Sequence, residues 1–200
     1  MMKELIFASN NPNKVHEIQS AIGNIIKVNS LSDAGINIEI PEPHDTLEAN
    51  ALEKARTIYR LTNKDCFGED TGLEVKALNG EPGVKSARYA GQARDSEKNI
   101  EKLLHELLSR ENREARFRTV ISLIYESQEY LFEGICEGQI AVNKRGLQGF
   151  GYDPVFVPSG SNRTFAEMDM NEKNRLSHRR RAADKLVLFL QQQIDKTRTT

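Results

Sequence analysis

The sequence is poor in three features that would each place it in a special class: paired cysteines, a long apolar run and an excess of one charge. Its two cysteines, Cys66 and Cys136, lie far apart in apolar segments, so we expect two reduced, buried thiols and no disulfide or metal site. The chain has 28 Lys and Arg against 29 Asp and Glu. This balance argues against a strong electrostatic grip on a nucleic-acid polymer.

The first apolar run, residues 5–8, is too short for a secretory signal or a membrane span. We therefore expect a cytoplasmic protein with no membrane partner. Repeats, low-complexity segments and long linkers are also missing from the sequence, which predicts a single domain over residues 1–195 and a frayed tail at residues 196–200. Neither Gly-x-x-x-x-Gly-Lys-Ser/Thr nor Gly-x-Gly-x-x-Gly after a strand occurs, which argues against a P-loop kinase or a dehydrogenase.

Apolar spacing predicts alternating strands and helices, and hence an α/β fold. Asn11 and Asp95 are positioned to cap helices, and Gly23 to end the first helix; for the second helix, Asp45 and Thr46 are alternative caps. The expected strands cover residues 5–8, 36–40, 66–77, 117–125, 130–140 and 155–158. The expected helices start at residues 12, 46 and 96, and a last helix opens with the basic run 173–181.

The first strand runs into a polar turn, residues 9–14, that leads directly to a helix N-terminus. Free backbone N–H groups and the helix dipole make such a turn a ready-made anion site. Lys14 lies in the first helical turn, where the dipole disfavours a cation unless an anion lies between them. A lysine that simply reaches into solvent explains this segment equally well.

Three carboxylates lie at predicted strand ends: Glu42, held between two prolines, and the adjacent pair Glu69 and Asp70. Paired carboxylates at a fixed strand end suit Mg²⁺, or a water molecule that must lose a proton. Taken alone, Glu69 and Asp70 are explained more simply as a solvated acidic turn.

Two later segments could contact a ligand. Residues 146–154 place three glycines around Phe150 and Tyr152, so that the backbone can approach a ligand closely and Phe150 can lie face-on to a flat ring; a packed turn is the alternative. Residues 173–181 are rich in Lys, His and Arg. Carboxylates for a metal, cations for phosphates and an aromatic ring for a base are the parts of a nucleotide site.

Six segments then match one known pattern in order: residues 9–14 with Glu17, 42–51, 69–73, 86–91, 149–154, and Lys173 with 177–179. In these segments the chain resembles the inosine triphosphate pyrophosphatases, also called the Ham1-like or non-canonical purine nucleoside triphosphate pyrophosphatases. The resemblance implies an elongated α/β fold with a long mixed central sheet flanked by helices, two lobes with an active-site cleft between them, and a homodimer. It also implies hydrolysis of ITP, dITP and XTP to the monophosphate and pyrophosphate, with Mg²⁺.

The same resemblance implies a role for each matching residue. Asp70 becomes the proton acceptor for the attacking water, Glu42 and Asp70 become the Mg²⁺ ligands, and Glu69 becomes a supporting carboxylate. The implied substrate contacts, chiefly with the phosphates, are Ser9, Asn10, Asn11, Lys14, Thr71 and Lys173. The implied contacts with the base are Phe150, Gly151, Tyr152, Asp153, His178 and Arg179.

The chain departs from the family pattern at two places: Glu69 stands where Asp is common, and Pro43-His44 where Thr-Gly is common. Three alternatives stay open. A Maf-like pyrophosphatase has a similar fold, but residues 149–154 and 177–179 favour the Ham1-like family. A nucleic-acid-binding module using Arg175 to Arg181 would leave the acidic residues unexplained. A catalytically dead relative would be expected to lose Asp70.

Overall fold

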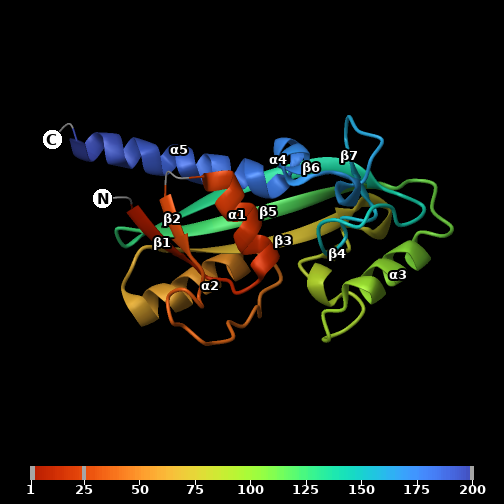
Figure 1. The fold of residues 1–200 in the computed structure, drawn as a ribbon. Coiled ribbons are helices and arrows are strands. Elements are labelled where there is room, and N and C mark those ends of the chain that lie inside the picture. The colour runs from red at the N-terminus through yellow and green to blue at the C-terminus, as the bar shows by residue number, and fades with distance from the viewer. Residues whose placement is uncertain (1–2, 24–25, 199–200) are drawn as a thin grey trace. The chain divides into compact units, whose positions relative to one another are not determined.

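The computed structural model describes residues 3–23 and 26–198, and in that part of the chain seven strands form one mixed sheet with helices around it (Figure 1). The strand order is β2-β1-β3-β5-β6-β7, and β4 pairs with β3. β1 is parallel to β2 and β3, whereas β4 and β7 pair in the antiparallel sense. The elements are β1 (Lys3–Phe7), α1 (Pro12–Ile22), β2 (Ile26–Asn29), α2 (Leu47–Thr62), β3 (Cys66–Val75), η1 (Lys76–Leu78), β4 (Pro82–Gly83), η2 (Ser86–Arg88), α3 (Ser96–Glu106), β5 (Glu114–Tyr125), β6 (Gln128–Ile140), β7 (Phe156–Pro158), η3 (Phe165–Glu167), α4 (Met170–Leu176) and α5 (His178–Arg198).

The chain divides into two compact units. The first comprises Met1–Asp70, Thr119–Gly134 and Arg179–Thr200, and the second comprises Thr71–Arg118 and Ile135–His178. Strands β3, β5 and β6 contribute residues to both. The expected α/β architecture with a mixed sheet is confirmed.

In the first unit, helices cover both faces of β1. Leu5 and Phe7 pack with α1 and α5, while Ile6 and Ala8 pack with α2. Figure 1 shows α5 and α2 on opposite sides of these strands. Because both faces are covered, residues 5–8 form an uninterrupted apolar run with no polar alternation.

The second unit has its own core, in which α3 packs against strands β3 and β5. Ile100 and Leu103 of α3 lie in one cluster with Leu73, Phe117 and Phe156. The aromatic rings of Phe117 and Phe156 are 4.6 Å apart between centroids. The buried residues of α3 therefore belong to the hydrophobic core of this unit.

Several local predictions are confirmed. Asn11 caps α1, which begins at Pro12 and is closed by Gly23, and Asp95 caps α3. Of the two candidates for α2, the structure selects Thr46, whose hydroxyl accepts a hydrogen bond from the N–H of Ala49. These features depend on residues within four positions of one another, which is why the sequence alone determines them.

Other predictions were wrong. Residues 36–40 form no strand: Ile36 and Ile40 pack as half-buried side chains against the α2 side of the core, but the backbone lies outside the sheet. The position beside β1 is taken by β2, which the sequence analysis missed. The expected last helix is two helices, because Ser177 has extended backbone between α4 and α5. α5 continues to Arg198, so residues 196–198 of the expected frayed tail are helical, and 199–200 lie outside the described residues.

Over the described residues, none of the helices combines the length and apolar character needed to span a bilayer.

Candidate active site

Strand β3 and helix α2 touch at Gly68, immediately before the acidic pair. A Cβ atom on Gly68 would lie 2.2 Å from the carbonyl oxygen of Ala51 and 2.8 Å from the Cβ of Lys54. The inner face of α2 lies directly on β3 at this point, so a residue larger than glycine does not fit at position 68. This close approach places Asn50 and Lys54 of α2 beside Asp70 of β3.

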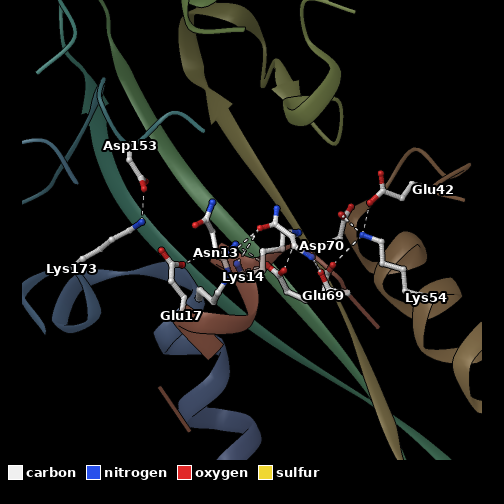
Figure 2. Close-up of polar contacts among 12 residues, drawn as sticks. Asn13, Lys14, Glu17, Glu42, Lys54, Glu69, Asp70, Asp153 and Lys173 are labelled. Atoms are coloured by element: carbon white, nitrogen blue, oxygen red, sulfur yellow. Dashed lines mark hydrogen bonds and ion pairs between the residues drawn. The ribbon is translucent and has the colours of Figure 1, made fainter. Parts of the chain in front are cut away.

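Lys54 joins the two predicted metal ligands. Its Nζ atom lies 2.6 Å from Oε1 of Glu42 and 2.8 Å from Oδ1 of Asp70, and it donates to the backbone carbonyl of Glu69 at 3.0 Å (Figure 2). The side chain of Lys54 is only 7% exposed. A loop, a helix and a strand thus bring three charged groups to one point.

Burial and ion pairing act against each other on the pKa values of Asp70 and Lys54. It raises the pKa of the Asp70 carboxyl, and the nearby charge of Glu42 adds to that rise, while Lys54 and Lys14 oppose it. For Lys54, burial favours the neutral amine, but the attraction of Asp70 and Glu42 outweighs burial and raises the pKa of the ammonium group. Asp70 is therefore a stronger base than an exposed aspartate, and Lys54 stays charged.

The sequence analysis missed both Asn50 and Lys54, although a signal was present. The buried stripe of α2 consists of Leu47, Asn50, Ala51, Lys54, Ala55 and Ile58. An amide and an ammonium group at stripe positions of an otherwise apolar helix face need buried polar partners. That argument could have marked the two residues, but the sequence could not say which carboxylates they meet.

Glu69 lies at the centre of a second buried network. Its Oε2 atom is 2.9 Å from Nζ of Lys14, and its Oε1 atom accepts from Nη2 and Nε of Arg179 at 3.0 and 3.2 Å. Arg179 also pairs with Glu17 of α1. The carboxylate of Glu69 thus contacts two cations from different helices, and its supporting role in catalysis stays a prediction.

The polar turn before α1 is tied down by side-chain hydrogen bonds. Oγ of Ser9 accepts from the N–H of Asn11 at 3.1 Å, and Oδ1 of Asn10 accepts from the N–H and the hydroxyl of Ser32, both at 2.9 Å. Oδ1 of Asn11 accepts from the N–H groups of Asn13 and Lys14 at 3.0 and 3.3 Å. These contacts give the N-terminus of α1 a fixed backbone shape.

The glycine-rich loop of the second unit is closed by Asp153. Oδ2 of Asp153 accepts from the N–H of Phe150 at 2.9 Å and from Nζ of Lys173 at 2.5 Å (Figure 2). That Nζ lies 5.2 Å from the centre of the Phe150 ring, within cation–π range. Gly149 has φ +76°, and a Cβ there would lie 2.1 Å from Oδ2 of Asp153, so this turn requires glycine.

Three further predicted substrate contacts have structural partners of their own. Tyr152 is buried and donates its hydroxyl to the backbone carbonyl of Ser86 at 2.8 Å, and burial raises the pKa of its phenol. His178 is buried and stacks on Phe117, with ring centroids 4.5 Å apart. Thr71 follows Asp70 directly in β3 and is half-buried. Contact of these residues with a nucleotide stays a prediction.

The carboxylates present would suit a hard divalent cation. Within residues 3–23 and 26–198, no group of three or more His, Cys, Asp and Glu side chains is arranged to hold a metal. Glu42 and Asp70 nevertheless already converge on one cation, the Lys54 ammonium. Mg²⁺ is commonly held by one or two carboxylates, with water and substrate phosphate oxygens completing its shell, and this pair fits that pattern.

Together the fold and these side chains define an α/β protein with a buried acid–lysine cluster next to a capped helix N-terminus. The sequence matches the model of the Ham1 family over residues 5–189, and the chain belongs to that family.

Relatives and solved structures agree over nearly the whole chain. A Flavobacterium psychrophilum protein named dITP/XTP pyrophosphatase is 50% identical, covering 93% of this chain and 98% of its own. A Bacillus subtilis protein of the same name is 42% identical, covering 96% of this chain and 98% of its own. The structure of the Staphylococcus aureus Ham1 protein is similar with a TM-score of 0.86 at 39% identity, covering 96% of this chain and 100% of its own.

Proposed function

We propose that this protein hydrolyses the non-canonical purine nucleoside triphosphates ITP, dITP and XTP to the monophosphate and pyrophosphate. The observation that carries the proposal is the convergence of Glu42 and Asp70 on the Lys54 ammonium, beside a buried network that holds Lys14 at the N-terminus of α1. Relatives named dITP/XTP pyrophosphatase support the substrate class. Magnesium, a homodimer and a cytoplasmic location belong to the same proposal.

In the proposed reaction, water attacks the α-phosphorus while the bond from that phosphorus to the α–β bridging oxygen breaks. Asp70 accepts the proton of the attacking water, a role that its raised pKa favours. Pyrophosphate leaves, and Lys14, which pairs with Glu69 beside Asp70, balances part of its charge. Mg²⁺, held by Glu42 and Asp70, would neutralise phosphate charge and acidify the water that attacks.

Base selection is proposed to rest on hydrogen-bond donors that face the 6-oxo group of hypoxanthine or xanthine. A donor aimed there is left unpaired by the amino group of adenine, and a buried mismatch of this kind gives large selectivity. His178 and Arg179 were the predicted donors. The guanidinium of Arg179 already donates to Glu69 and Glu17, so we propose that a backbone N–H group carries more of this contact.

The proposal is tested by pyrophosphate release from ITP, dITP, XTP, ATP, GTP and dTTP, with and without Mg²⁺. We expect the first three to be preferred and Mg²⁺ to be required. Asp70→Asn keeps the shape of the side chain but removes the base, so kcat should fall on the order of 10²- to 10⁴-fold. Equal rates on ATP and ITP would contradict the substrate assignment, and full activity of Asp70→Asn would contradict the mechanism.

A further inference from the structure

Asn50 lies between the two acidic residues of the candidate site and touches the chain segment of one and the side chain of the other. It is fully buried in the second turn of α2. Its Oδ1 atom accepts from the N–H of His44 at 2.9 Å, and its Nδ2 atom donates to the carbonyl oxygen of His44 at 3.0 Å. The same Nδ2 atom is 3.5 Å from Oδ2 of Asp70.

The segment that carries Glu42 has no regular structure to hold it. Residues 36–46 belong to neither helix nor strand. His44 lies two positions after Glu42, with the rigid Pro43 between them. Because one amide pairs with both backbone groups of His44, Asn50 fixes this segment in position and in orientation.

Asn50 and Lys54 are one helical turn apart on α2 and make different kinds of contact with the acidic residues. Lys54 neutralises Glu42 and Asp70 by direct contact. Asn50 is uncharged and acts on the backbone of one segment and on the carboxylate of the other. Both contacts with residue 44 are with its backbone and do not depend on its side chain.

We propose that Asn50 is a positioning residue that sets the separation of the Glu42 and Asp70 carboxylates. This inference rests on the proposed function, since those carboxylates are its metal ligands and base. These contacts reach outside α2, to the segment that carries Glu42 and to the carboxylate of Asp70, so they do more than stabilise the helix.

The experiment compares Asn50→Ala with Asn99→Ala. Asn99 is a matched control because it is also a buried helical asparagine that pairs with backbone, accepting from the N–H of Ala90 at 2.7 Å and donating to the carbonyl of Ala87 at 3.0 Å. Each variant is assayed for kcat and KM on ITP. Mg²⁺ alone is titrated into each free protein by calorimetry, and the unfolding temperature is measured.

Both variants should unfold at lower temperature, because Asn50→Ala loses three hydrogen bonds and Asn99→Ala loses two. Only Asn50→Ala should lower kcat, by about 10- to 100-fold with little change in KM, since small misplacements of reacting groups have costs of that size. Only Asn50→Ala should also weaken Mg²⁺ binding to the free protein. If Asn50→Ala does not fold, Asn50→Asp keeps the shape and the acceptor but loses both donors, and its kcat should fall as well.

An active wild type whose Asn50 variants lose stability but keep wild-type kcat and Mg²⁺ affinity would overturn the positioning role while leaving the proposed function intact. A wild type that releases no pyrophosphate from any of the triphosphates would overturn the proposed function, and this inference with it.

Discussion

Lys54 is the residue on which the charge balance of the site depends. It contacts two carboxylates in a place where little water reaches any of the three groups. Removing one partner from a buried ion pair leaves the other charge uncompensated, which costs more than the pair contributed. The ammonium group is therefore as important for stability as for binding a substrate.

Lys54→Met should lower the free energy of unfolding by about 3–5 kcal/mol at neutral pH without divalent metal, as expected for a broken buried pair. A folded-state pKa that is raised, as for Asp70, makes a stability contribution that is present at low pH and is lost as pH rises through that pKa. Loss of Lys54 raises the pKa further. The deficit of the variant should therefore shrink as pH falls toward 5, and urea titrations at several pH values measure this.

Lys76→Met is the control for that experiment. Lys76 pairs with Glu114 at 2.8 Å, but both side chains are well exposed, so the pair is screened by water. Its loss should leave the unfolding free energy nearly unchanged at every pH. Equal effects of the two substitutions would show that burial does not govern the Lys54 cluster.

At the scale of the element, helices α1 and α3 have the same kind of cap but different surroundings. Asn11 accepts from the N–H groups of Asn13 and Lys14, and Asp95 accepts from those of Glu97 and Lys98. Only the α1 N-terminus lies in the predicted phosphate-binding turn. Substitutions at Asn11 and Asp95 should therefore have the same effect on helix stability but different effects on substrate binding.

Asn11→Ala and Asp95→Ala should each cost about 1 kcal/mol of stability, the usual effect of losing a cap. Only Asn11→Ala should raise KM for ITP, because it also loosens the turn that is predicted to bind the phosphates. Urea unfolding and steady-state kinetics measure the two effects. A similar rise in KM for both variants would argue against a phosphate site at α1.

At the scale of the whole molecule, the charge distribution favours an enzyme acting on nucleotides over a protein that binds RNA or DNA. The net charge is −1. The basic run near the start of α5 is also split by the fold: Arg179 is buried against Glu69 and Glu17, and Arg180 pairs with Asp184. Few cations of this run are left to track a phosphate backbone.

We therefore expect no binding of a labelled single-stranded RNA or duplex DNA at physiological salt, about 0.15 M, in fluorescence anisotropy titrations. Tight binding that weakens steeply with salt and disappears in an Arg175→Ala, Arg181→Ala double variant would support the nucleic-acid alternative instead.

The sequence by itself determined the features that depend on near neighbours. Asn11 and Asp95 cap helices because their side chains reach N–H groups two and three residues on. The ordered motifs also identified Glu42, Glu69, Asp70 and Lys14, which the structure brings together in the first unit.

Only the tertiary structure decided which distant segments meet. The alternation of Ile36, Ile38 and Ile40 is compatible with a strand, but pairing also needs a free neighbouring edge, and β2 occupies the edge of β1. Asn50 and Lys54 of α2 reach Asp70 only because Gly68 allows α2 to lie against β3. Their shared partner Asp70 is 16 positions from Lys54 and 20 from Asn50, and no local pattern encodes a contact over that distance.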